Sequence, residues 1–287
     1  MDNLCHILVG AALGEAGLKR RTRLGHPTLM IASNLPDIDV LAFTTSTPAV
    51  ALRRGWTHGV LADVFLPLIL TGVILLVLRL RRRADVQVRP RWLLALSYIG
   101  VVSHVLLDLL NNYGVRPLMP FERHWFYGDS VFIIDPWLWL VLGGGVWLAR
   151  RARSTAPARK SLVLAALYIT VMVISARAAR EIVADSWRSM RGSELRSLMV
   201  GPVPVNPFER TIIADAGDHY ETGVFTWLPV HVTFDSDIVP KNDQDPRVRR
   251  ARDAECPRDF LGLFHAQTAN RSSQAECRGF ETLHPLR

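Results

Sequence analysis

The sequence has little cysteine and none of the short motifs that mark several common enzyme classes. Of its 3 cysteines, Cys5 stands alone in an apolar stretch, and Cys256 and Cys277 can form a disulfide only if their part of the chain faces an oxidising compartment. GxSxG, P-loop, GxGxxG and HExxH patterns are absent, so serine hydrolases, nucleotide hydrolases and dinucleotide enzymes have no support. Residues 1–18 lack a basic n-region and a cleavage site, and we expect no cleavable signal peptide.

The positive charge is concentrated in the more apolar part of the chain. Residues 1–185 carry 21 Lys and Arg against 12 Asp and Glu, whereas residues 186–287 carry 13 against 14. A sequence pI near 10 raises the question of nucleic-acid binding. The basic residues flank apolar segments, however, which is typical of membrane topology. We therefore predict a membrane protein that binds no nucleic acid.

Apolar runs predict an α-helical membrane bundle of about 4–6 segments. The strongest candidates are 60–80, 92–111 and 131–149, and a shorter run, 161–176, can continue as helix to Asp185. Two earlier runs, 4–18 and 28–43, are shorter or interrupted by polar groups. Three alternatives stay open for this early pair: short spans, a re-entrant pair, or a soluble helical hairpin.

Alternate loops between these segments carry 15 of the 21 basic residues. The positive-inside rule places such loops in the cytoplasm, so we expect the remaining loops and the C-terminal part to face outward. The basic residues are Lys19, Arg20, Arg21 and Arg23, then Arg79, Arg81, Arg82, Arg83, Arg89 and Arg91, then Arg150, Arg151, Arg153, Arg159 and Lys160.

The C-terminal part differs in kind from the apolar part. Residues 211–214, 219–227 and 230–234 have strand-like composition, with Gly and Pro between them. We predict two domains: a helical membrane domain over residues 1–185 and a small β-rich extracytoplasmic module over residues 186–287.

Six ionisable residues lie in or beside the apolar segments, at the ends that the charge rule places outside. Ionisable groups at membrane depth are costly and usually functional, and all six are of metal-ligand type. The sequence therefore predicts a metal site whose candidate ligands are His6, Asp37, Asp39, His58, His104 and Asp108.

Two of the patterns are informative by their spacing. His104 and Asp108, at i and i+4 of an expected helix, share one face and suit either half of a divalent-metal site or an interhelical hydrogen-bonding pair. Asp37 and Asp39 are two residues apart and repel each other unless a cation or proton lies between them.

Arginine and histidine residues near these positions suggest a substrate site. Arg54 suits an anionic group such as phosphate, although an arginine here also fits lipid headgroups. The loop 112–136 follows directly on Asp108, so we expect Arg116, Arg123 and His124 to contact substrate.

Four motifs together resemble a known family. Asp2-Asn3-x-x-His6, Asn34-Leu-Pro-Asp-Ile-Asp39, Arg54-Gly-x-Thr-His58 and Ser103-His-x-x-x-Asp108 are similar to the bacterial inner-membrane metal-dependent hydrolases of the YdjM type. The resemblance covers roughly residues 1–150. It implies a multi-pass protein of the bacterial inner membrane and a hydrolase activity. Arg53 stands where the family commonly has a histidine.

Two functional hypotheses follow. In the first, the chain is a membrane-embedded hydrolase that uses a divalent metal such as Zn²⁺, with Asp39 or Asp108 as general base and Arg54 binding the substrate. Its substrate is then a membrane lipid or another lipid-like ester or phosphoester at the outer leaflet. In the second, the chain is a non-enzymatic membrane scaffold, transporter or stress-response protein with a structural metal or none.

Overall fold

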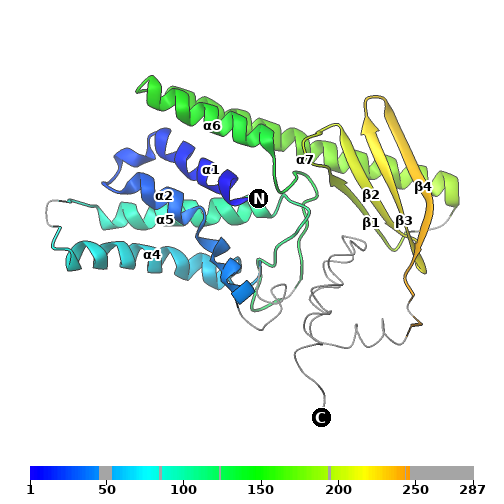
Figure 1. Cartoon of the computed structure of the whole chain (residues 1–287), viewed down its shortest axis with the longest axis horizontal. Helices are drawn as coiled ribbons and strands as arrows, with labels where there is room; N and C mark the ends of the chain where they lie inside the picture. Colours follow the sequence, from blue (N-terminus) through cyan, green and yellow to red (C-terminus); the bar gives the residue numbers. More distant parts are fainter. Residues whose placement is uncertain (45–53, 84–85, 123, 193–194, 243, 246–287) are drawn as a thin grey trace, which may run out of the picture. The chain divides into compact units, whose positions relative to one another are not determined.

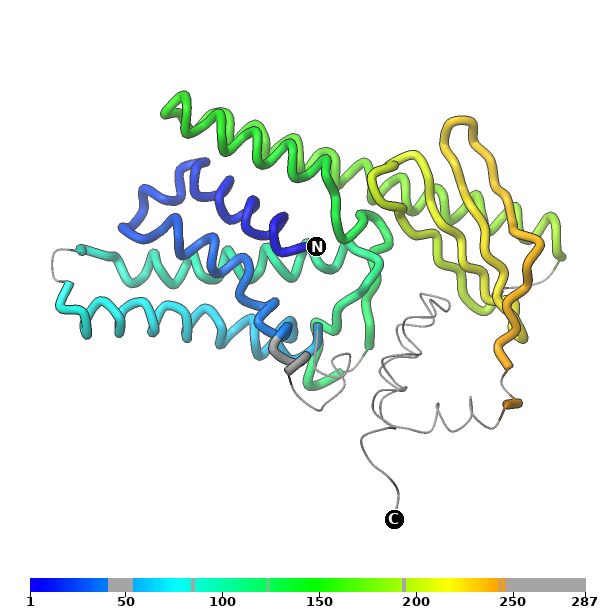
Figure 2. The backbone as a smooth tube through the Cα atoms, in the orientation of Figure 1, coloured from blue at the N-terminus to red at the C-terminus, as the bar shows by residue number. Residues whose placement is uncertain are grey.

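The computed structural model describes residues 1–44, 54–83, 86–122, 124–192, 195–242 and 244–245. Helices come first and a sheet follows them (Figures 1 and 2). The chain forms two compact units, one of Met1–Arg177 with Pro202–Pro207, the other of Ala178–Gly201 with the residues from Phe208 onward. The predicted fold class, a helical membrane bundle with a C-terminal β-rich module, is confirmed.

Side-by-side helices build the first unit. Helix α4 packs on α5, α5 on α2, α2 on α1, and α1 on α6 (Figure 1). In chain order the helical elements are α1 (Asn3–Glu15), the 3₁₀ helix η1 (Leu18–Arg20), α2 (Gly25–Ala32), the 3₁₀ helix η2 (Leu35–Thr44), α4 (Val60–Leu80), α5 (Pro90–Asp108), α6 (Pro136–Arg151) and α7 (Ala156–Arg191).

The starts of three helices follow from local chemistry. The side chain of Asp2 caps α1 by accepting from the backbone N–H of Leu4. Asp135 caps α6 by accepting from the N–H of Leu138, and Pro136 fills the first helical position. Helix α5 also begins with a proline, Pro90. The caps of α1 and α6 and the proline of α5 set where each helix begins.

Within the described residues, three helices are long and apolar enough to cross a membrane: α4, α5 and α7. The expected segment 60–80 coincides with α4, whereas the expected segment 131–149 becomes helical only at Pro136 and yields 16 residues in α6. Helix α1 has 13 residues and α2 has 8. Both fall short of the roughly 20 residues that a spanning helix needs, so their lengths disfavour separate spans.

A four-stranded sheet forms the second unit together with the C-terminal part of α7. The strands follow one another in the order β1 (Ser197–Pro202), β2 (Glu209–Asp215), β3 (His219–Trp227) and β4 (Val230–Pro240). Strands β2, β3 and β4 are antiparallel neighbours. Val183 and Trp187 of α7 pack with Ile212 and Phe225 of the sheet in a buried cluster, which gives this unit its own core.

Candidate metal centre

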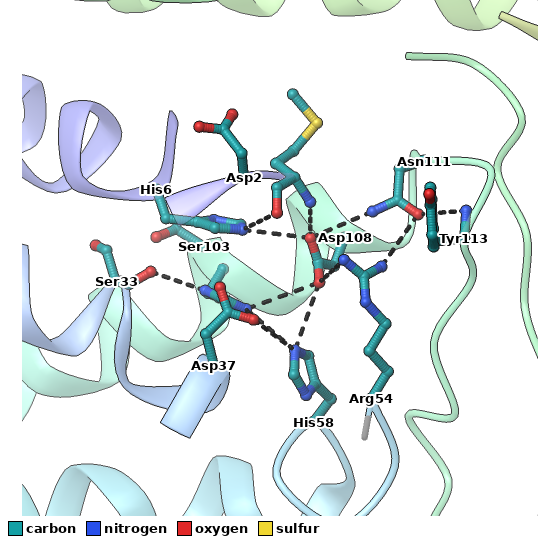
Figure 3. Close-up of polar contacts among 12 residues, drawn as sticks. Asp2, His6, Ser33, Asp37, Arg54, His58, Ser103, Asp108, Asn111 and Tyr113 are labelled. Carbon is teal, nitrogen blue, oxygen red and sulfur yellow. Dashed lines mark hydrogen bonds and ion pairs between the residues drawn. The ribbon is translucent and has the colours of Figure 1, made fainter. Parts of the chain in front are cut away.

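The ionisable residues singled out in the sequence come together inside the first unit. Figure 3 labels His6, Asp37, His58 and Asp108. His6 lies in α1, Asp37 and Asp39 lie in η2, and His58 precedes α4. His104 and Asp108 lie in the last turns of α5. His6, His58, His104 and Asp108 are fully buried, while Asp37 and Asp39 are 8% and 6% exposed.

Four of these residues point ligand atoms at one another. Asp37, His58, His104 and Asp108 each offer one such atom, and all four atoms lie within 4.8 Å of one another. The two histidine Nε2 atoms are 3.1 Å apart. Asp37 Oδ1 lies 3.8 Å and 3.7 Å from the Nε2 atoms of His58 and His104. Asp108 Oδ2 lies 3.4 Å and 3.8 Å from the same two atoms.

These separations suit a tetrahedral ion. Ligand atoms about 2.1 Å from a tetrahedral metal are roughly 3.4 Å from one another, which lies within the 3.1–3.8 Å range of the five distances above. Asp108 Oδ2 is buried and accepts no hydrogen bond from the described residues. A buried carboxylate oxygen without a donor is costly, so the chemistry and the geometry of these four groups both fit a bound divalent cation.

The backbone fixes the ring of His104. Its Nδ1 lies 2.8 Å from the carbonyl oxygen of Ser33. A carbonyl can only accept, so Nδ1 carries the proton and donates it, and in the neutral ring Nε2 presents a lone pair to the cluster. Metal-binding histidines are commonly oriented by such a bond.

The two carboxylates of η2 lie on different sides of His58. Asp37 faces its Nε2, whereas Asp39 Oδ2 lies 3.6 Å from its Nδ1. Asp39 Oδ2 also accepts from the backbone N–H of Arg54 at 2.8 Å and from the hydroxyl of Thr57 at 3.1 Å. The ring of His58 therefore stands where the sequence suggested a cation between the two carboxylates.

His6 lies beside the four-residue cluster. Its ring stacks on that of His104, with centroids 3.7 Å apart. Its Nε2 lies 3.3 Å from Asp108 Oδ1, the carboxylate oxygen that also contacts the amino group of Met1. His6 thus contacts the opposite oxygen of Asp108 from the one that faces His58 and His104.

Arg54 reaches the same carboxylate from the other direction. Its Nη2 lies 3.6 Å from Asp108 Oδ2, and its Nη1 donates to Asn111 Oδ1 and to the carbonyl oxygen of Gly114, both at 3.3 Å. Its guanidinium also lies over the ring of Tyr113. The arginine is 7% exposed, so one fixed positive charge stands directly beside the cluster.

The other expected substrate contacts are placed differently. Arg116 is buried; its backbone N–H donates to the carbonyl oxygen of Arg54, and its guanidinium lies over the ring of Trp125. His124 is exposed and its ring meets Phe126 edge-on. Arg123, Cys256 and Cys277 lie outside the described residues.

Sequence reasoning missed three contributors to the site. Asn111 orients Arg54 and donates to Asp108 Oδ1 at 3.4 Å; its position three residues after Asp108, just beyond the end of α5, was an available signal. Thr57 contacts both Asp39 and His58, and it stands in the motif that carries His58. Ser33 contributes through its backbone carbonyl oxygen. A backbone contact of this kind cannot be inferred from the identity of the side chain.

With this geometry established, the comparisons define the class of the protein. The family described as "YdjM inner membrane protein" matches residues 1–179, more than half of the chain, and the chain belongs to that family. The resemblance based on the four motifs is thereby confirmed.

The alignment with one relative covers more of the chain than the family match does. The chain is 25% identical over 213 residues to "Uncharacterized protein YfhP" of Bacillus subtilis (strain 168), an alignment that covers 70% of this chain and 62% of that protein. The chain thus spans less than two thirds of the length of this relative. No solved structure matches the chain.

Proposed function

We propose that the protein is a divalent-metal-dependent hydrolase of the bacterial inner membrane, acting at the outer leaflet on a lipid or another phosphoester. The observation that carries the proposal is the buried Oδ2 of Asp108, which accepts no hydrogen bond from the described residues and faces two imidazole nitrogens at 3.4 Å and 3.8 Å. Membership of an inner-membrane family supports the location.

Asp37, His58, His104 and Asp108 would hold the ion, for which two nitrogens and two oxygens in tetrahedral spacing favour Zn²⁺. When bound, the ion supplies a Lewis acid at the scissile bond. Arg54 would bind an anionic group of the substrate beside the cluster. Of the two carboxylates considered as general base, Asp108 would be occupied as a ligand of the ion, and Asp39 faces the far nitrogen of His58; the geometry therefore assigns the role of base to neither.

The same cluster also supports a second function. Structural zinc sites are closed by four protein ligands, whereas catalytic sites keep one position for water or substrate. Four protein groups converge here, which fits a structural metal in a non-enzymatic membrane protein.

In the hydrolase, water and substrate would enter beside Asp37. Its side chain is 9% exposed, while those of His58, His104 and Asp108 are fully buried.

The proposed membrane orientation is based on the positions of the basic loops. Lys and Arg gather between the apolar segments on alternate loops, which by the positive-inside rule leaves the metal cluster and the β-rich module outside. A substrate at the outer leaflet is consistent with that placement.

The decisive experiment combines metal analysis of the purified full-length protein with hydrolysis assays on phospholipid vesicles and soluble phosphoesters. We expect about one divalent ion per chain, a coordination number above four by X-ray absorption because water binds beside the four protein ligands, and turnover that chelation abolishes and Zn²⁺ restores. Bound metal with four protein ligands and no turnover on any of these substrates would establish the structural alternative. Protein that binds no divalent ion would refute both versions of the metal site.

A further inference from the structure

Thr57 lies between a carboxylate and a candidate metal ligand. Its hydroxyl oxygen is 3.1 Å from Asp39 Oδ2 and 2.9 Å from His58 Nδ1. Asp39 Oδ2 already accepts the backbone N–H of Arg54 at 2.8 Å, so this oxygen acts as an acceptor. A carboxylate only accepts, so the proton of the Thr57 hydroxyl points to Asp39.

The direction of that bond decides the state of the His58 ring. With its proton directed at Asp39, the Thr57 oxygen presents a lone pair to His58, and Nδ1 must therefore donate. In a neutral ring the proton then sits on Nδ1, and Nε2 turns a lone pair toward the cluster. This is the state in which a histidine binds a metal through Nε2.

The consequence appears at His104. Its Nδ1 donates to the carbonyl of Ser33, so its Nε2 also presents a lone pair, 3.1 Å from that of His58. Two lone pairs at this distance repel unless a cation lies between them. In a neutral His58 ring, the hydrogen bond through Thr57 thus excludes the competing tautomer, which carries its proton on Nε2 and donates it to His104.

We propose that Thr57 is a positioning residue that transmits the charge of Asp39 to His58 and holds its ring in the metal-binding tautomer. The inference rests on the proposed metal site and assigns a role to a residue that does not itself touch the ion. Asp39, which the sequence suggested as a ligand or a base, acts in this arrangement through Thr57 and through the backbone of Arg54.

The test compares Thr57→Val, which removes the hydroxyl and keeps the shape, with Thr57→Ser, which keeps the hydroxyl. Thr28 provides a matched control, because it is 1% exposed in α2 and its hydroxyl donates to the backbone carbonyl of Leu24. Losing the partner that orients a metal-binding histidine typically costs about 10–100-fold in affinity. We expect a Zn²⁺ affinity lowered by that factor in Thr57→Val, and no loss beyond about threefold in Thr57→Ser and Thr28→Val.

A second readout is independent of metal. In metal-free, ¹⁵N-histidine-labelled protein, nitrogen chemical shifts should show His58 protonated at Nδ1 in the parent and in Thr57→Ser, and at Nε2 in Thr57→Val. The His58 signals are assigned by their loss in His58→Ala. Should Thr57→Val not fold, Thr57→Ala removes the same hydroxyl and must give the same shifts.

The outcomes separate this inference from the proposed function. Tight metal binding by the parent and equally tight binding by Thr57→Val, with His58 still protonated at Nδ1, would overturn the role of Thr57 and leave the metal site intact. A parent protein that binds no metal would refute the proposed function. If nitrogen chemical shifts also showed His58 of the parent protonated at Nε2, the role of Thr57 would be refuted as well.

Discussion

The Nε2 atoms of His58 and His104 lie 3.1 Å apart, although one histidine precedes α4 and the other lies near the end of α5. Asp37 Oδ1 is almost equally far from both, at 3.8 Å and 3.7 Å. A hydrogen bond that joins two helices needs one donor for each acceptor and does not require these two distances to be equal. Near-equal distances are the arrangement that acceptors around a shared cation adopt.

The first prediction concerns this cation. His104→Ala and Asp108→Ala should each lower Zn²⁺ affinity by at least about 100-fold, because even partners that only orient a ligand cost about 10–100-fold when lost. Metal content of the purified variants checks this, and His124→Ala, an exposed residue against Phe126, serves as the control. Full metal stoichiometry in both cluster variants would show that the pair only joins helices.

The second prediction separates substrate binding from metal binding at Arg54. Arg54→Ala should keep its metal, since removing a positive charge 3.6 Å from Asp108 does not weaken cation binding. It should lower kcat/KM on anionic esters by about 100–1,000-fold, the range of one lost charge-stabilising donor, and much less on matched neutral esters. Arg54→Lys should recover part of the loss, because a point charge cannot replace a planar fork.

Equal hydrolysis of both ester types by Arg54→Ala and by the parent would remove Arg54 from the site. It would also remove the main argument for a phosphoester substrate, while the metal prediction above would stand.

Much of this fold could be predicted because its signals are local. The apolar run 60–80 coincides with α4, and the strand-like segment 219–227 coincides with β3. Strand β1 was not predicted because it ends in Gly201 and Pro202, residue types depleted from strands. The start of α6 was placed too early because apolarity alone ignores the Asp135-Pro136 start signal.

The candidate site was predictable only at the level of side-chain types. Polar groups in apolar segments indicated which residues meet, but their directions depend on backbone geometry. Asp37 and Asp39 illustrate this, because a 3₁₀ helix has three residues per turn and turns positions two apart to different sides. One carboxylate therefore faces His58 Nε2 and the other faces its Nδ1.

The third prediction tests the orientation in the membrane. Reporter fusions placed after Arg287 and within residues 84–90 should report opposite sides, because the latter segment lies in a basic loop that should be cytoplasmic. A fusion in the turn around Arg153, which follows α6, should agree with the fusion at 84–90. The same side for the 84–90 and C-terminal fusions would reject the outward placement of the β-rich module.

The fourth prediction concerns pH and the second unit. His219 Nδ1 lies 2.6 Å from Asp218 Oδ1, and its Nε2 lies 3.4 Å from Glu221 Oε1. The hydrogen bond to Asp218 raises the pKa of His219 above its usual 6.5, and the same bond lowers the pKa of Asp218 below 3.8.

The sign follows from these two shifts. The raised pKa of His219 contributes stability that is fully present below pH 6.5 and is lost as pH rises through the folded-state pKa. The lowered pKa of Asp218 contributes stability above pH 3.8 that is lost as pH falls through its folded-state pKa. Hydrogen-exchange protection of β3 should therefore be highest near pH 5. An NMR titration of Asp218→Asn that leaves the pKa of His219 unchanged would contradict the assignment.

The last prediction links helix packing to the metal centre through Gly100. A methyl group at Gly100 of α5 would lie 2.5 Å from the Cβ of Ala32 and 2.8 Å from the backbone nitrogen of Ser33. Both distances are too short, so Gly100→Ala must push α5 and the end of α2 apart. The carbonyl of Ser33 that orients His104 moves with that backbone.

We expect Gly100→Ala to lose about 1–3 kcal/mol of stability by overpacking and to bind Zn²⁺ at least about tenfold more weakly, through misorientation of His104. Gly72→Ala is the matched control, since a methyl group there meets nothing within 4 Å among the described residues and alanine favours the helix by up to about 1 kcal/mol. Denaturant unfolding in detergent and Zn²⁺ titration of both variants check the pair. If Gly100→Ala were destabilised but bound Zn²⁺ as tightly as Gly72→Ala, the backbone of Ser33 would not control the ring of His104, and the orientation of that ligand would have to come from its neighbours within the cluster.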